Sequence, residues 1–180
     1  MKKTVLTFGL IAGAFLAATM ALTMAFFDRI HDQAGIVGYA IGYTTMILAF
    51  LMVYFGIRSY RDNVNAGTIG FGKAFKVGIL ITLVASACYV AAWQVIYRTM
   101  VPDFMDKYAA AVIEKARAGG ASEAVIEAKR KEMAEFAEMY KNPVVNMGMT
   151  FVEVFPVGLL MTLGSAWFLS RRKAGAGVPA

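Results

Sequence analysis

Four long apolar segments, separated by shorter charged ones, limit what this chain can fold into. They cover residues 4–27, 33–57, 77–97 and 144–169, and Glu153 is the only charged residue inside them. A transmembrane helix needs about 20 predominantly apolar residues, so each segment is long enough to cross a bilayer. The sequence therefore predicts an all-α polytopic membrane protein, a single domain with four transmembrane helices.

Composition agrees with this prediction and excludes an ordinary soluble domain. Of the 180 residues, 59% are apolar, and buried helices of soluble proteins are usually shorter and keep a polar stripe. Lys2 and Lys3 precede the first segment as in a secretory signal, but the apolar run continues without a break to Phe27. We therefore expect an uncleaved first span. Cys88 is the only cysteine, which excludes an intramolecular disulfide.

Positive charge lies almost entirely on one side of the four predicted spans. The amino terminus, the 58–76 connection and the carboxyl-terminal tail together carry nine basic residues and one acidic residue. The 28–32 turn and the 98–141 segment together carry nine basic and ten acidic residues. Short positive flanks stay in the cytoplasm. We therefore expect a bacterial inner membrane protein with both termini in the cytoplasm. Its net charge of +6 is explained by basic residues that contact anionic lipid headgroups, without any need for nucleic acid.

Residues 102–142 predict an extracytoplasmic helical hairpin between the third and fourth spans. Gly119-Gly120 should break the helix, Ser122 suits the N-cap of the second helix, and Asn142-Pro143 should end it. Each helix has an apolar stripe. The two stripes either pack against each other, or one of them docks onto another protein. The stripes comprise Phe104, Met105, Tyr108, Ala109, Val112, Ile113 and Ala116, and then Val125, Ile126, Met133, Phe136, Ala137 and Tyr140.

Small residues recur every four positions in all four spans. The first span contains Gly9 and Gly13, and the second contains Gly38 and Gly42. Such positions let helix backbones approach closely, which favours helix association in lipid. The pattern fits packing within one four-helix bundle and also fits self-association between chains.

Glu153 is the strongest candidate for a functional or structural site inside the membrane. It lies four residues from the midpoint of its segment, or roughly 6 Å at ~1.5 Å per residue. An ionised carboxylate there costs at least ~2.5–3.5 kcal/mol, so we expect Glu153 to face the bundle, to be protonated, or both. Pro156 follows and predicts a kink. Candidate polar partners at similar depth are Thr19, Thr23, Tyr39, Tyr43, Tyr89 and Gln94.

These residues allow two interpretations of Glu153. The group could form a structural hydrogen-bond cluster, or it could hold a proton or a cation. The remaining candidates lie in the predicted cytoplasmic turn between the second and third spans, and they are Arg61, Asp62, Asn63 and Lys73.

Other motifs point away from catalysis. Residues 67–73 read G-x-x-x-x-G-K, but a phosphate loop needs Ser or Thr next and should follow a strand, whereas Ala74 comes next between two predicted spans. Asp28, His31 and Asp32 crowd one short turn and make a poor metal site. We therefore expect no nucleotide, cofactor or metal, no catalytic residue, and no enzyme activity.

Several sequence blocks resemble one known family. They are Tyr60-Arg61-Asp62-Asn63, GFGKAFKVG at 70–78, PDFMDKYA at 102–109, MYKNP at 139–143 and FVEVFPVGL at 151–159. In this order they are similar to the bacterial membrane family numbered 4199 among the domains of unknown function. The resemblance implies a four-span bacterial membrane protein and supplies no catalytic residue.

Two functions remain open on the sequence. The first is a non-enzymatic membrane protein that acts by association with itself or with other membrane proteins in the lipid bilayer. The second is a small proton- or cation-coupled transporter or channel subunit that uses Glu153. A water-filled polar cavity reaching Glu153 would favour transport, and its absence would favour association.

Overall fold

The computed structural model describes residues 1–25 and 36–171, with side chains at 1–25 and 40–171. In these ranges the chain forms helices and short connections, without a strand. The helices are α1 (Lys2–Ala25), α3 (Ile36–Val64), α4 (Phe71–Thr99), α5 (Phe104–Ala118), α6 (Glu123–Tyr140) and α7 (Pro143–Arg171). The all-α prediction is confirmed, and α1, α3, α4 and α7 are each long and apolar enough to cross a membrane.

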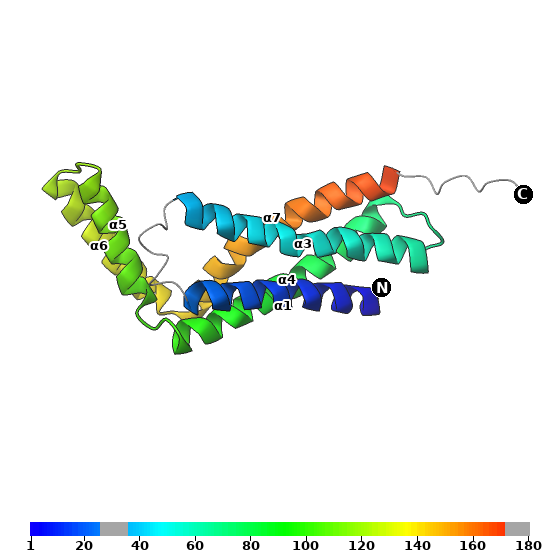
Figure 1. Ribbon diagram of the computed structural model, residues 1–180, viewed down its shortest axis with the longest axis horizontal. Coiled ribbons are helices and arrows are strands. Elements are labelled where there is room, and N and C mark those ends of the chain that lie inside the picture. Colours follow the sequence, from blue (N-terminus) through cyan, green and yellow to red (C-terminus); the bar gives the residue numbers. More distant parts are fainter. Residues whose placement is uncertain (26–35, 172–180) are drawn as a thin grey trace, which may run out of the picture.

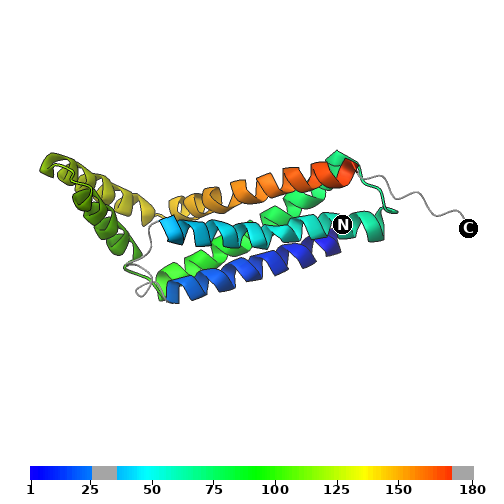
Figure 2. The same cartoon turned by 45° about the horizontal axis from the view of Figure 1, so that its top comes forward.

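The four long helices form an elongated bundle, and α5 and α6 project together from one end of it (Figures 1 and 2). Helix α1 packs against α3 and α4, and α7 packs against the same two helices, so α1 and α7 lie on opposite sides. The start of α1, the α3–α4 connection and the end of α7 lie at the end away from α5 and α6 (Figure 1). The described basic flanks, from Lys2 to Arg171, therefore share one end of the bundle.

Close helix packing explains most of the small-residue pattern. Gly9 and Gly13 of α1 lie directly against Val84 and Cys88 of α4. The four-residue repeats of α4 and α7 are buried throughout, and Gly78 contacts Thr162. These repeats therefore serve packing inside one bundle. Gly42 of α3 differs, because no atom of the described residues lies within 4 Å of the position its Cβ would take.

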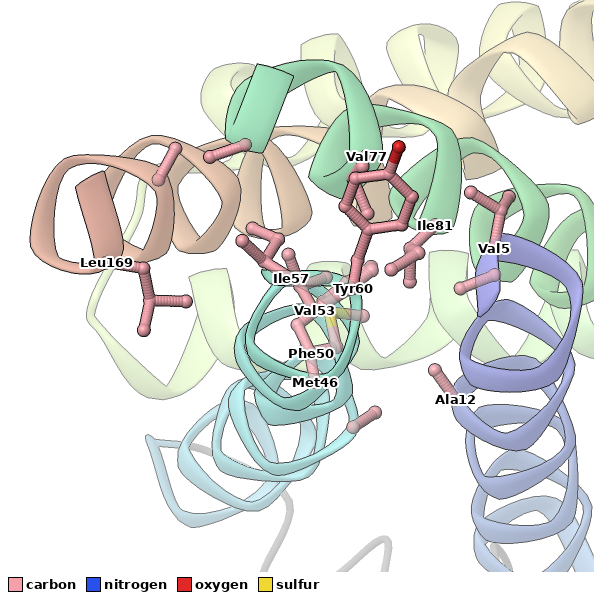
Figure 3. Close-up of a cluster of buried hydrophobic side chains, with 14 of the residues drawn as sticks. Val5, Ala12, Met46, Phe50, Val53, Ile57, Tyr60, Val77, Ile81 and Leu169 are labelled. Atoms are coloured by element: carbon pink, nitrogen blue, oxygen red, sulfur yellow. The ribbon is translucent and has the colours of Figure 1, made fainter. Parts of the chain in front are cut away.

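The larger of two buried hydrophobic clusters fills the half of the bundle away from α5 and α6 and reaches Val154. The smaller cluster lies at the other end and comprises Met20, Trp93, Ile96, Val101, Met105 and Tyr140. Figure 3 shows Phe50, Val53 and Ile57 of α3 directed toward Val77 and Ile81 of α4. All five side chains are fully buried. Aliphatic and aromatic side chains thus close this half of the bundle.

Helices α3 and α4 extend well beyond the predicted spans. Most of the 58–76 connection is helical, and only residues 65–70 form a loop. Ala66 and Gly67 adopt left-handed backbone angles, with φ of 52° and 78°, and the Gly67 N–H donates to the Arg61 carbonyl at 2.9 Å. A helix does not have to end where its apolar segment ends, because polar residues continue it outside the hydrocarbon.

The helices between α4 and α7 agree with the sequence in most details. The chain breaks at Gly119-Gly120 as predicted, with Gly120 at a φ of 76°. The two helices pack side by side, with the Tyr108 and Phe136 rings 6.5 Å apart. Val125 was wrongly placed in the buried stripe, since it is 46% exposed while the neighbouring Ile126 is buried. Ser122 occupies the N-cap position, but its hydroxyl makes no capping hydrogen bond.

Candidate functional site

An aromatic cluster joins α5 and α6 to the end of the bundle. The Trp93 indole N–H of α4 donates to the Tyr140 hydroxyl of α6 at 2.9 Å, and burial raises the pKa of that hydroxyl. The Trp93 and Phe104 rings are 5.0 Å apart, and the Tyr97 and Tyr140 rings are 5.5 Å apart. These edge-to-face contacts stabilise the junction and form one wall of the space beside Glu153.

Glu153 lies on α7 and borders a cavity of about 260 Å³ to which α1, α3, α4 and α7 all contribute. Glu153 borders this space, but the residue is exposed, so the expectation that it faces the bundle stays a prediction. Four of its six predicted partners border the same cavity, and they are Thr19, Thr23, Tyr43 and Tyr89. Gln94 instead donates to the Asn146 side chain at 2.6 Å. The Tyr39 side chain lies outside the described ones.

A second cavity, of about 270 Å³, lies between the bundle and the α5–α6 pair. Met20, Met24, Tyr89 and Glu153 border both cavities, so the carboxylate stands where the two spaces meet. The rest of the second lining is mainly aromatic rings and thioethers, and it comprises Trp93, Phe104, Met105, Tyr108, Phe136, Tyr140, Met149 and Thr150.

The electrostatic environment of Glu153 is unusual for a membrane helix. Its carboxylate makes neither a hydrogen bond nor an ion pair within residues 1–25 and 40–171. Both cavities lack a basic side chain among their described lining residues. Glu153 is itself exposed, so it presents an uncompensated negative charge, or a neutral acid, to two hollows that are half open to the surface of the bundle.

On the side of Glu153 away from α5 and α6, polar contacts hold α4 against α7. The Thr82 hydroxyl lies 3.2 Å from the Gly158 carbonyl oxygen and 2.9 Å from the Thr162 hydroxyl. Thr82 and Thr162 are fully buried, as is Phe50 beside Gly158. These contacts separate the two cavities beside Glu153 from the other half of the bundle. In that half a shallow, open hollow of about 440 Å³ lies between α1 and α3, lined by Phe8, Met52, Phe55, Arg58, Ser59, Asp62 and Asn63.

Pro156 lies within α7, one turn after Glu153, and the helix continues through it. Proline has no backbone N–H, so the carbonyl of Val152 lacks its usual intrahelical donor. The predicted kink stays a prediction.

The candidates in the α3–α4 connection form a separate group at the far end of the bundle. Arg61 Nε donates to Asp62 Oδ1 at 2.6 Å, and Asn63 Nδ2 donates to Ser59 Oγ at 3.2 Å. Lys73 Nζ donates to Asn65 Oδ1 at 2.7 Å. These bonds are local and hold the turn in shape, and the G-x-x-x-x-G-K segment follows a helix rather than a strand. The structure does not bring these residues near Glu153.

Sequence reasoning missed several residues around the site. Nothing in the spacing of Met20, Met24, Met105 and Met149 indicated that their side chains would line shared spaces beside Glu153. Asn146 is buried and bonded to Gln94, and both residues could have been noticed as amides within apolar segments. No metal-binding group of His, Cys, Asp or Glu occurs in the described part of the chain. Asp28, His31 and Asp32 lie outside the described residues, as do Arg172 and Lys173.

Comparisons with curated proteins and with solved structures give no match. The model of one family, described as "Protein of unknown function (DUF4199)", matches residues 7–171. That range contains all the sequence blocks that carried the resemblance, together with both cavities and Glu153. The chain therefore belongs to the DUF4199 family.

Proposed function

We propose that this protein is a small transporter or channel subunit that takes up a proton or cation at Glu153. The observation that carries the proposal is a carboxylate without a described partner where two spaces meet. The described lining of these spaces is mostly apolar, so they differ from the water-filled polar cavity expected of a transporter, and the proposal depends on the carboxylate. A purely structural hydrogen-bond cluster would satisfy this carboxylate with neighbouring donors. Among the described residues, the polar side chains that border the first cavity, Thr19, Thr23, Tyr43 and Tyr89, make no hydrogen bond to the Glu153 carboxylate.

The charge pattern supports, as part of this proposal, a bacterial inner membrane location with both termini in the cytoplasm. Basic residues gather at the end of the bundle away from α5 and α6, and short positive flanks remain cytoplasmic. In this orientation α5 and α6 form an extracytoplasmic helical hairpin. The cavities at Glu153 then lie in the outer half of the bundle.

Uptake of a positive charge would relieve the cost of holding the carboxylate in the membrane, at least ~2.5–3.5 kcal/mol. The cavity also offers hydroxyl oxygens as acceptors. The Thr19 hydroxyl donates its hydrogen to the Phe15 carbonyl at 2.8 Å, and the Thr23 hydroxyl donates to the Thr19 carbonyl at 2.9 Å. Their oxygen lone pairs are therefore the groups left for a bound cation.

Passage through the membrane requires a rearrangement of the closed half. The Thr82–Gly158–Thr162 contacts and the buried Phe50 seal the bundle below Glu153. Separation of α4 from α7 would open this seal. If four spans are too few to enclose a path for the ion, several chains would assemble around it.

A flux assay in liposomes tests the proposal. Purified protein is reconstituted, and proton and potassium fluxes are measured for the wild type and for Glu153→Gln, which keeps the shape and removes the charge. We expect flux from the wild type and loss of most of it in the variant. Asp62→Asn is the matched control, because it neutralises a carboxylate at the far end. Equal flux in wild type and Glu153→Gln, or the absence of any proton, potassium or organic-cation flux from the wild type, would refute the proposal.

The second candidate function is non-enzymatic association with another membrane protein or another copy of this chain. The supporting observation is that the α5–α6 pair leaves Val125 and Met139 about half exposed. The small-residue repeats no longer argue for association, since most of them pack inside the bundle. Crosslinking after purification in mild detergent tests this candidate, and a strictly monomeric protein without partners would count against it. Both functions need the lipid bilayer and neither needs a nucleotide, nucleic acid or catalytic residue.

A further inference from the structure

We infer that the ligand of the Glu153 cavities is an organic monocation with an aromatic or branched apolar body, such as a substituted quaternary ammonium ion. The inference rests on the proposed function and names the ligand class for the same site. The two cavities supply what such a molecule needs, which is one negative charge and a large apolar surface beside it.

The size of the space suits a small organic molecule. The cavities measure about 260 and 270 Å³ and share Met20, Met24, Tyr89 and Glu153 in their linings. Sites for drug-sized ligands usually measure roughly 300–1,000 Å³. Either cavity alone fits a molecule with a single ring, and the two together reach the lower part of this range.

The charge of the lining selects a cation over an anion or a neutral molecule. Glu153 is the only charged residue in either described lining. Aromatic faces add to this preference, because their negative quadrupole attracts a positive group, most strongly for tryptophan. Tyr89 borders both spaces, and Trp93 and Tyr140 border the second, so rings surround the route from the carboxylate toward α5 and α6.

The same lining disfavours a bare metal ion. A hard cation requires about six oxygen ligands to replace its hydration shell. The second cavity offers mainly rings and thioethers, whose apolar surface fits an organic body far better than hydrated sodium or potassium. Met20, Met24, Met105 and Met149 give this surface a flexible character, since the thioether side chain adapts its shape to what it contacts. We therefore expect tolerance toward the body of the ligand and strictness toward its charge.

The geometry points to one orientation for the bound molecule. The cationic head lies at Glu153, where the cavities meet, and the body extends into the second cavity, against Trp93 and Phe104. Trp93 is therefore a built-in reporter of occupancy. The chain has two tryptophans, and Trp167 lies near the far end of α7, where the Arg171 guanidinium stacks over its ring at 4.1 Å. Replacing Trp167 with phenylalanine leaves Trp93 as the single fluorophore.

The test is a fluorescence titration of the full chain carrying Trp167→Phe, reconstituted in nanodiscs of zwitterionic lipid. The probe is benzyltrimethylammonium, and its neutral counterpart is neopentylbenzene, in which carbon replaces the nitrogen. We expect saturable quenching or a spectral shift of Trp93 with the cation. Adding Glu153→Gln should weaken binding by at least about 30-fold, because one partner of a desolvated charge pair is lost. Glu153→Asp should retain most of the affinity, and Asp62→Asn should leave it unchanged.

Three results would overturn the inference. The first is that the cation shows no saturable binding to the protein that keeps Glu153. The second is that neopentylbenzene binds as tightly as the cation. The third is that the Glu153→Gln variant binds the cation with unchanged affinity. An unchanged Trp93 emission spectrum of unliganded Glu153→Gln verifies that the variant is folded. Glu153-dependent proton or potassium flux without benzyltrimethylammonium binding would overturn the ligand class and leave the proposed function standing. Charge-dependent binding without any flux, including flux of the bound cation, would support the ligand class and refute transport.

Discussion

Replacing Gly158 with alanine should push α4 and α7 apart and destabilise the bundle. A Cβ at this position would overlap Thr82 Cγ2 and would stand 2.7 and 2.8 Å from two ring carbons of Phe50. Ordinary van der Waals contact begins at 3.4 Å, so the neighbours must move by roughly 1 Å. Neither can move freely, because both are fully buried and the Thr82 hydroxyl is bonded to α7.

The size of the effect follows from two opposing terms. Overpacking a filled core costs about 1–3 kcal/mol. Alanine in place of glycine within a helix recovers about 0.5–1 kcal/mol. We therefore expect Gly158→Ala to lower the free energy of unfolding by up to about 2.5 kcal/mol, and by about 1 kcal/mol at the middle of the two ranges. Gly164 lies on the same helix, and no atom of the described residues lies within 4 Å of its Cβ position. Gly164→Ala should therefore show only the stabilisation that alanine gives a helix in place of glycine.

The measurement is unfolding of the purified protein in mixed micelles of rising SDS fraction, followed by circular dichroism. The difference between the two alanine variants isolates the overpacking cost, because the helix term is common to both. Equal unfolding free energies for Gly158→Ala and Gly164→Ala would refute the close packing of α4 on α7.

Three further predictions use the same protein. Thr82→Val keeps the side-chain shape and removes the hydroxyl bonded to α7, so the unfolding free energy in the SDS assay should fall by about 0.6–1.7 kcal/mol, while exposed Thr7→Val should have no effect. Gln94→Leu leaves the buried Asn146 side chain without its donor and should cost about 1–3 kcal/mol, most of which a second Asn146→Leu change should restore. Trp93→Phe removes the N–H donor to Tyr140 and should speed proteolysis at Gly119-Gly120 about two- to tenfold. Trp167→Phe is the control and should leave the rate unchanged. An equal rate in both variants would contradict the role of the Trp93–Tyr140 hydrogen bond.

Much of the fold could be predicted from the sequence, because the bilayer imposes simple rules. Hydrocarbon requires long apolar helices, so segments such as 77–97 and 144–169 identified α4 and α7 without knowledge of any contact. The break at Gly119-Gly120 was equally clear, since a glycine pair readily interrupts a helix. Helix ends were less clear, and the continuation of α3 to Val64 was missed because polar residues extend a helix outside lipid.

The candidate site shows where such prediction ends. Glu153 was evident as the charge in an apolar segment, and its depth suggested which hydroxyls could lie near it. Depth alone cannot fix how each helix is rotated about its axis. Gln94 was therefore expected near Glu153, whereas the structure turns it toward Asn146 and places Met20 and Tyr89 beside the carboxylate.

By itself, then, the sequence determined that the chain has four long apolar segments, a basic end and one acidic residue within an apolar segment. The tertiary structure decided that the small residues close one half of the bundle and that open space remains around Glu153 in the other half. The physical reason is that hydrophobicity is a property of each residue, whereas a cavity depends on how side chains from several helices fill a shared volume.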